Sequence, residues 1–437
     1  RESVNGYPLL SFTTLNLSGE PELKITIKGT RPVEVDVTRL SETVAQERID
    51  QIKQDIFIVV QHFEEHTRES TLYFAWREGE ELIPEKITGK ENKALNRLFL
   101  ETQIFLAIVF ISLSIVLFMF LGIYAPILLI SLQLIIVFHS NKIIARAGDW
   151  EITSANPKIH LIQYHLPTEE YEEFKKKYSR KELIQIKKEV YEQTLSDGRK
   201  IDCETAQKIF SKHGFQCREE NMLAKTVNVY ELVKKTAGKF RLPMPKVVVS
   251  NTMIPNAAAS GPSPKRGLIL ITTGLLVQLE EDEVLSVLGH EFSHLKSRDP
   301  LILFGLTALE FLLRFYVILP FFPIIFSSYV FFFLYFWAVM AIIYFIAKFF
   351  EAKSDLVSAM IIGKPKSMAE ALEKIGFRRL QYERSPAYRL QRWIGLEPHP
   401  PVTFRVNRLK KLEVPVQIKH PLLQSIQDVT RGLLSNF

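Results

Sequence analysis

The stretch 280–299 reads EEDEVLSVLGHEFSHLKSRD and holds His290, Glu291 and His294 in an HExxH pattern. Residues four apart share one face of a helix, so both imidazoles can reach a single metal ion. Glu291 follows His290 directly and can therefore act beside that ion as a general base for water. Three acidic residues before the apolar VLSVL run are typical of a helix start near Glu281. The sequence therefore predicts a helix that carries a zinc site.

The HExxH pattern has two alternative interpretations besides a catalytic metal site at the surface of a membrane. Two histidines four residues apart can stand on an ordinary helix without a metal. An intramembrane metalloprotease would carry the pattern inside an apolar span, whereas here Lys296, Arg298 and Asp299 follow it and acidic residues precede it. These charges favour a metal site at the surface of a membrane.

The apolar residues of the chain are clustered. The chain has 437 residues, about three times a typical domain of roughly 150, which predicts more than one structural unit. Hydrophobic residues make up 47% and charged residues 24%, both ordinary for a globular protein. The window 331–350 nevertheless reads FFFLYFWAVMAIIYFIAKFF, which no water-exposed surface carries. A wholly soluble protein is excluded.

Two apolar blocks, 104–138 and 301–350, each predict a transmembrane hairpin. The first is broken by LGIYAP at 121–126 and the second by PFFP at 320–323, where proline favours a turn. The halves of the first block, about 17 residues each, reach only about 26 Å as helices, so a shallow dip or a single span is the alternative there. The second block also holds Glu310 and Arg314, four residues apart, which we expect to pair in a structural role.

The distribution of charge predicts how the chain is oriented. Positive flanks on both sides of each block favour a cytoplasmic location for every soluble part, in a multi-pass protein of the cell membrane. These flanks are Lys90, Lys93 and Arg97, then Lys142 and Arg146, for the first block, and Lys296 and Arg298, then Lys348 and Lys353, for the second. The net charge of +7 does not indicate nucleic-acid binding, because Lys and Arg are interleaved with Asp and Glu.

A carboxylate is the usual third protein ligand of a hydrolytic zinc site that keeps one position for water. Glu351 stands where the fourth apolar helix ends, so the second hairpin would return this carboxylate to the predicted site. Asp355, one helical turn further on, can hydrogen-bond a ligand imidazole. The alternative is a solvated acidic residue that merely follows a membrane span.

Several further strings carry a family resemblance. They are LPMPKVVV from residue 242, NAAASG from 256, KRGLILITTGLL from 265, VLGHEFSHLKSRD from 287, EAKSD from 351 and HPPVTFR from 399. In this order they resemble the HtpX-type membrane zinc metalloproteases and, more distantly, the CAAX prenyl endopeptidases of the same gluzincin clan. The first 100 residues have no counterpart in the usual short N-terminus of HtpX-type proteins.

The resemblance implies one zinc ion per chain, bound by His290, His294 and Glu351. It also implies that Glu291 is the general base and that Asp355 supports the site.

The resemblance reaches two further segments. The late HPP-x-x-x-R pattern falls on His399 and Arg405, which looks like a pair that stabilises the oxyanion or orients the site. Asn256 and Ala258 lie in the segment similar to the family's edge strand and would pair with an extended substrate backbone by strand addition.

We therefore expect an α+β membrane protein, with strands at KVVVS from residue 246 and at GLILITT from residue 267. It would combine a mainly helical zincin-type catalytic domain that has a small β-sheet, about four transmembrane helices in two hairpins and a small N-terminal α/β domain. The expected segments are 1–100 for the N-terminal domain, 101–140 for the first hairpin, 141–300 for the cytoplasmic metalloprotease domain with the HExxH helix, 301–350 for the second hairpin and 351–437 for the rest of the metalloprotease domain.

The expected function is that of a membrane-anchored zinc endopeptidase that cleaves extended or misfolded protein segments in quality control. Its partners would be polypeptide substrates, with membrane proteins among them, and the lipid bilayer. A processing protease for lipid-modified substrates is one alternative, although it needs a larger intramembrane chamber. A non-catalytic membrane scaffold with a zinc site is another, and the presence of Glu291 stands against it.

Overall fold

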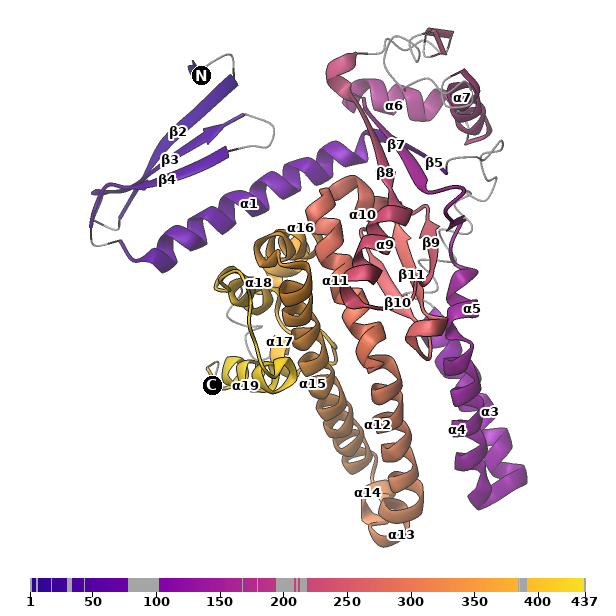
Figure 1. Ribbon diagram of the computed structural model, residues 1–437. Helices are drawn as coiled ribbons and strands as arrows, with labels where there is room; N and C mark the ends of the chain where they lie inside the picture. The colour runs from indigo at the N-terminus through magenta and orange to yellow at the C-terminus, as the bar shows by residue number, and fades with distance from the viewer. Residues whose placement is uncertain are drawn as a thin grey trace. The chain divides into compact units, whose positions relative to one another are not determined.

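The architecture is that of a computed structural model, shown in Figure 1. Its described residues are 2–4, 7–16, 18–29, 34–42, 44–77, 102–166, 168–178, 180–193, 208–209, 211–212, 218–383, 385 and 391–435. They form two compact units, Arg1–Glu69 and Ser70–Phe437.

The first unit is a four-stranded antiparallel sheet with one long helix. The sheet has the order β1-β2-β3-β4, and Leu23 and Ile25 of β3 alternate onto its buried face. Ile49 and Ile52 of the helix pack against them, which closes a small core. The elements are β1 Glu2–Val4, β2 Tyr7–Leu15, β3 Pro21–Lys28, β4 Glu34–Arg39 and α1 Gln46–Glu69.

This unit is shorter than the N-terminal domain expected over residues 1–100. It ends at Glu69, and the next strand, β5 (Thr71–Arg77), pairs with β7 (Lys158–His165) in the second unit. Phe74 and Trp76 of β5 are buried in that second core, which outweighs their closeness in sequence to the first unit. Residues 78–101 lie outside the described part.

Two sheets lie in the second unit. The first has the antiparallel order β5-β7-β8 and packs on helices α6 and α7. The second has the order β10-β11-β9-β6; its central strands β9 and β11 are parallel, and β10 forms one edge. The strands predicted at KVVVS and GLILITT are confirmed as β9 and β11. The remaining bounds are β6 Trp150–Ile152, α6 Thr168–Lys177, α7 Arg180–Gln193, β8 Met222–Asn228, β9 Lys246–Ser250, β10 Ala257–Ser260 and β11 Leu268–Thr272.

The HExxH helix α11 (Glu281–Ser297) begins where the sequence predicts. A capping box between Glu280 and Glu283 satisfies its first backbone N–H groups. Arg298, in a left-handed conformation with φ of 54°, ends it and turns the chain into α12. The helix packs against α9 (Val229–Phe240), β10 and α15, so its two faces are both covered.

Of the remaining helices, α12 to α15 form the second hairpin, and α16 to α19 pack on α15 (Figure 1). In that hairpin α12 lies beside α15, and the turn predicted at PFFP falls between α13 and α14. The bounds are α10 Thr273–Gln278, α12 Asp299–Leu313 with a π-helical turn Arg314–Ile318, α13 Leu319–Phe321, α14 Ile324–Ser327, α15 Tyr329–Ile362, α16 Pro365–Glu383, α17 Gln391–Ile394, α18 Val402–Lys410 and α19 Pro421–Leu434.

The count of candidate membrane spans differs from the expected four. Among the described residues, three helical stretches are long and apolar enough: Phe110–Phe138, Asp299–Phe321 and Tyr329–Ile362. The first begins within α3 (Thr102–Leu121) and continues through a 3₁₀ turn and α4 (Ala125–Phe138). The short α5 (Ser140–Ala145) follows it. With 14 residues α4 is only about 21 Å long, less than the roughly 30 Å hydrocarbon core.

The expected pair within the second hairpin forms. Arg314 Nε lies 2.9 Å from Glu310 Oε1, and Tyr335 of α15 donates its hydroxyl to the same oxygen at 2.8 Å. The two charges thus neutralise each other and link the helices of the hairpin.

Close packing of α11 on α15 depends on Gly289. A Cβ atom there would lie 2.6 Å from both Ile362 Cγ1 and Ser358 Oγ. We expect Gly289→Ala to lower the free energy of unfolding by about 1–3 kcal/mol through overpacking, measured by thermal unfolding in detergent. The matched control is Gly238→Ala in α9, where a Cβ meets nothing within 4 Å and the extra methyl should stabilise the helix. Equal stability of the two variants would contradict the argument.

Candidate metal centre

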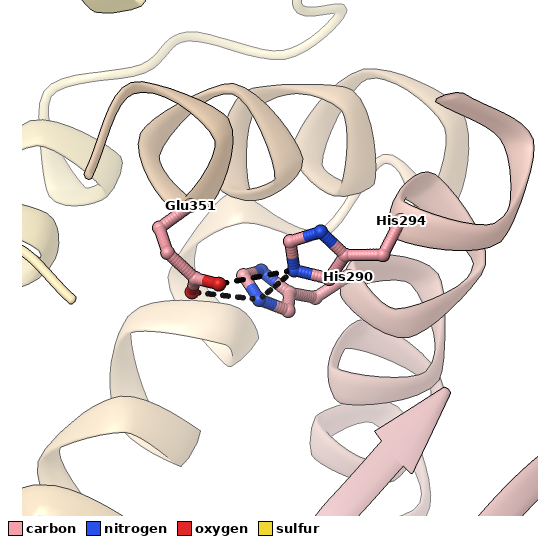
Figure 2. Close-up of side chains that lie close together, drawn as sticks. All are labelled: His290, His294 and Glu351. Carbon is pink, nitrogen blue, oxygen red and sulfur yellow. Dashed lines mark hydrogen bonds and ion pairs between the residues drawn. The ribbon is translucent and has the colours of Figure 1, made fainter. Parts of the chain in front are cut away.

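Three side chains from two helices converge in the second unit (Figure 2). His290 and His294 project from one face of α11, and Glu351 projects from α15. The Nε2 atoms of the two histidines lie 3.1 Å apart, and each is 3.3 Å from a different oxygen of Glu351. The residues that the sequence predicts as metal ligands are therefore in contact, although 57 positions separate His294 from Glu351 along the chain.

This donor set fits a zinc ion. Two imidazole nitrogens and one carboxylate oxygen are the protein ligands of many catalytic zinc sites. Ligand atoms about 2.0–2.1 Å from a tetrahedral centre lie about 3.3 Å from one another, close to the separations observed here. One ligand atom from each residue lies within 4.8 Å of the others, and His290 is buried.

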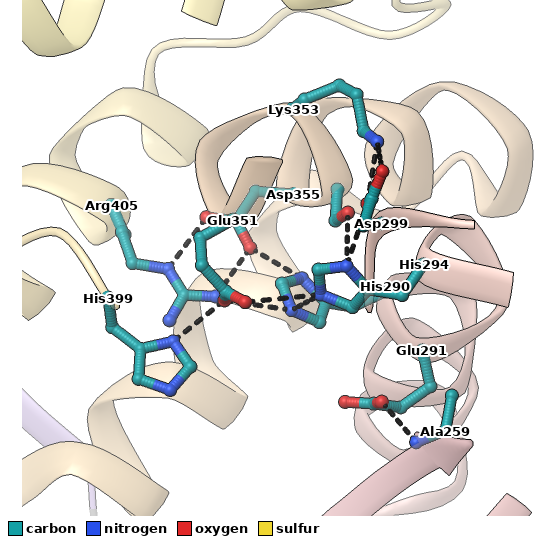
Figure 3. Close-up of polar contacts among 11 residues, drawn as sticks. Ala259, His290, Glu291, His294, Asp299, Glu351, Lys353, Asp355, His399 and Arg405 are labelled. Carbon is teal, nitrogen blue, oxygen red and sulfur yellow. Dashed lines mark hydrogen bonds and ion pairs between the residues drawn. The ribbon is translucent and has the colours of Figure 1, made fainter. Parts of the chain in front are cut away.

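Each imidazole is oriented through its other nitrogen (Figure 3). His294 Nδ1 lies 2.9 Å from Asp299 Oδ2, in hydrogen-bonding geometry. His290 Nδ1 lies 2.9 Å from Asp355 Oδ1, an ion-pair distance although the angle is poor for a hydrogen bond. A carboxylate at Nδ1 favours a proton on that nitrogen and leaves Nε2 to coordinate a metal.

The two supporting carboxylates have buried cationic partners of their own. Arg405 of α18 binds Asp355 through two hydrogen bonds of 2.7 Å, and both side chains are buried. Lys353 of α15 lies 2.7 Å from both oxygens of Asp299. Paired in this way, the carboxylates avoid the cost of an isolated buried charge and keep a defined orientation.

His399 lies at the open side of the centre. Its Nδ1 is 2.7 Å from Glu351 Oε2, and its side chain is 41% exposed. The resemblance gave the pair His399 and Arg405 two possible roles. Arg405 has the geometry that orients the site through Asp355, whereas His399 remains accessible to a substrate.

Glu291 faces the edge strand. The backbone N–H of Ala259 in β10 donates to Glu291 Oε2 at 2.7 Å (Figure 3). The general-base candidate therefore lies between the two histidines of its helix and the free edge of the sheet.

The register of β10 differs from the expected pairing at Asn256 and Ala258. The N–H of Thr272 donates to Asn256 O at 3.0 Å, so Asn256 directs its backbone toward β11. Backbone groups alternate along an antiparallel pair, and Ala258, opposite Leu270, is therefore also turned toward β11. Among the described residues of β10, Ala257 and Ala259 turn their backbone N–H and C=O groups away from β11, toward the open edge of the sheet.

Asp299 and Lys353 were missed by the sequence reasoning as supporting residues. Both stand in strings already quoted, but their roles depend on the turn at Arg298, which brings Asp299 back beneath His294. An acidic residue followed by proline, just after a helix of this kind, was the available signal for a new helix start.

The carboxylates also control the protonation of the two histidines in the metal-free protein. Burial alone would lower the pKa of His294, but Glu351 and Asp299 outweigh it and raise the pKa to about 10. Burial likewise opposes the charged form of His290, and Asp355 and Glu351 raise its pKa.

Comparison with known proteins agrees with this geometry. Residues 224–413 match the model of peptidase family M48. This part of the chain, called the M48 region below, is similar to that family. The M48 region contains both histidines, Glu351, His399 and Arg405.

Individual relatives are matched over shorter lengths. A protease HtpX homolog of Thermodesulfovibrio yellowstonii is 44% identical over 79 residues, which cover 18% of this chain and 28% of that protein. One from Pyrococcus furiosus is 42% identical over 74 residues, covering 17% and 26%. The matches thus span about a quarter of these relatives' length. One from Gemmatimonas aurantiaca is 28% identical over 224 residues, covering 42% and 75%.

Among solved structures, Ste24p from S. mikatae is similar at 18% identity, covering 41% of this chain and 49% of that one. Its TM-score is 0.31, too low to carry a structural argument.

Metal uptake should release protons. Below a pH of about 10 the metal-free site holds a proton on His294, which a metal must displace because only the neutral imidazole coordinates. We therefore expect zinc affinity to rise with pH up to that range and about one proton to leave per ion near pH 8. Calorimetric titration in buffers of different ionisation enthalpy measures this number. A binding enthalpy independent of the buffer would contradict the assignment.

Proposed function

We propose that this chain is a membrane-anchored zinc endopeptidase that cleaves extended or misfolded polypeptide segments, including those of membrane proteins. The contact between Glu291 and Ala259 carries the proposal. It puts a general base beside a strand edge to which an extended peptide can add, next to the cluster of His290, His294 and Glu351.

The metal in this proposal is one Zn²⁺ per chain, held by those three side chains. When bound, zinc would supply Lewis-acid chemistry that polarises a peptide carbonyl and makes water a stronger nucleophile at neutral pH. Asp299 and Asp355 keep the two imidazoles oriented for it, and Lys353 and Arg405 keep the two carboxylates in place.

Glu291 would move the protons of the reaction. Its carboxylate takes a proton from the attacking water and later delivers it to the nitrogen of the leaving amine. Its position on α11, one residue after His290, allows both transfers without a change in the backbone.

Substrate would bind along β10. Ala257 offers its N–H and C=O at the open edge and Ala259 its C=O, since the Ala259 N–H donates to Glu291, so an added strand would run beside Glu291. A helix or compact domain uses its own backbone groups internally and cannot add in this way. This requirement supports extended or misfolded segments as the substrate class, and a role in quality control follows from it.

His399 and Arg405 would have separate roles. The exposed His399 can offset the negative charge that develops on the substrate's carbonyl oxygen. Arg405 is held by Asp355 inside the protein and acts as a positioning residue for His290.

The membrane placement is part of the proposal. The candidate spans support anchoring in a bilayer, and the positive flanks favour a cytoplasmic location for residues 141–300 and 351–437, which together form the protease domain. In the sequence, α12 and the apolar first part of α15 lie between the histidines and Glu351. The site would therefore lie where the second hairpin leaves the membrane.

Glu291→Gln tests the activity. We expect the variant to lose cleavage of an unfolded model protein by about 10²–10⁴-fold while it retains zinc, because the amide cannot accept the proton. Zinc-loaded purified protein is assayed by gel cleavage, with metal content measured in parallel. The matched control is Glu281→Gln on the same helix, where the side chain is exposed and should not affect cleavage.

Two outcomes would overturn this proposal. Undiminished cleavage by Glu291→Gln would remove the general base. A wild-type protein that holds zinc but cleaves nothing would instead indicate a membrane scaffold.

A second pair of variants separates positioning from catalysis. Arg405→Lys keeps the charge but loses the two-pronged contact to Asp355, so we expect zinc affinity to fall about 10–100-fold. His399→Ala should lower kcat and reduce zinc affinity less than Arg405→Lys does, because it removes a single contact of an exposed side chain with Glu351. Competition with a zinc chelator and steady-state kinetics measure the two effects. Equal effects of both variants on zinc affinity would contradict the division of roles.

A further inference from the structure

The C-terminal helix α19 packs on the M48 region through one side. Arg408 of α18 donates to Asp428 at 2.8 Å and to Ser425 at 3.0 Å. Val429 is buried against Trp393, in a cluster that also includes Phe404. These contacts identify the protein-facing side of the helix.

The apolar surface of α19 is wider than this packed side. At about 100° per residue, five apolar side chains fall within an arc of about 120° that begins beside Val429. Leu423 is 57% exposed, and Leu422 and Leu434 are also exposed. The five are Leu422, Leu423, Ile426, Leu433 and Leu434, of which Ile426 and Leu433 are half-buried and Leu433 packs on the Val429 cluster. Exposed apolar side chains grouped in this way are unfavourable on a surface that faces water.

The opposite side of α19 is polar. Gln424 and Arg431 lie on it, whereas Gln427 lies at its border, only about 40° from Leu423, and Lys419 and His420 directly precede the helix. An exposed apolar row beside a polar row with basic residues is typical of a helix that lies in a membrane interface.

The neighbours of α19 set its depth. Its buried cluster includes Phe345 and Phe349 of α15, near the end of the apolar stretch that begins at Tyr329. At about 1.5 Å per residue these two rings lie about 24–30 Å along α15 from Tyr329, which matches the thickness of a hydrocarbon core of about 30 Å. The exposed leucines thus continue the lipid-facing surface of the hairpin at the end of α15 that lies farthest from Tyr329.

We propose that α19 lies in the headgroup layer of the bilayer, with Leu422, Leu423 and Leu434 inserted into lipid. This inference rests on the proposed insertion of the α12–α15 hairpin. The helix would then anchor the end of the protease domain at the membrane, next to the α18 segment that carries Arg405.

Spin-label depth measurements on the full chain test this placement. Cys203 and Cys217 are replaced by serine, and a nitroxide is attached at Leu423→Cys or at the exposed polar-side position Arg431→Cys. The protein is reconstituted into vesicles of phosphatidylcholine and phosphatidylglycerol. Oxygen, which enriches in lipid, and a water-soluble nickel chelate serve as relaxation agents. Leu334→Cys on α15, 58% exposed, reports on the hairpin itself.

We expect the label at Leu423 to be relaxed by oxygen, at a depth of about 5–10 Å, and the label at Arg431 by the nickel chelate. Leu434→Cys should repeat the result for Leu423. Equal access of the nickel chelate to both α19 positions would overturn the proposal, and so would shielding of Leu423 from both agents, which indicates a protein contact. If the label at Leu334 is also water-exposed, the hairpin insertion fails with it; a lipid-exposed Leu334 beside a water-exposed Leu423 rejects α19 alone.

Discussion

The charge balance of the buried centre is the constraint on which the rest depends. Three carboxylates, from Asp299, Glu351 and Asp355, lie within it, and among the described residues Lys353 and Arg405 are the permanent cations that contact them. Glu351 contacts His290, His294 and His399 instead, and its negative charge in this poorly hydrated place is costly unless a proton or a cation balances it. A proton on the histidine pair can balance it in the metal-free protein, and a divalent cation bound by the same atoms is a stronger solution.

This balance requires helices that are remote in sequence to meet at short range. The histidines precede the second hairpin, Glu351 and Asp355 follow it, and Arg405 comes from α18. Gly289 removes the side chain that would hold α11 and α15 apart. Because the hairpin connects the two halves of the site, anything that shifts α12 relative to α15 also shifts the ligands relative to one another.

Local pattern was enough to predict several elements of this arrangement. The acidic start and apolar run predicted α11, and the short β-branched and aliphatic runs predicted β9 and β11, because periodicity and capping act within a few residues. The extent of the N-terminal unit and the number of spans were predicted less well. The partner of β5 lies in another sheet, and α4 falls short of the length that its apolar composition suggested.

By itself the sequence determined the ligand types, since HExxH on a helix places two imidazoles on one face whatever surrounds them, and it determined that apolar helices separate these histidines from Glu351. Only the tertiary structure decided which charges hold the ligands: Asp299 with Lys353, and Asp355 with Arg405. It also decided that Ala257 and Ala259 form the open edge of β10. These features depend on contacts and strand register between segments far apart in the chain, which no local periodicity encodes.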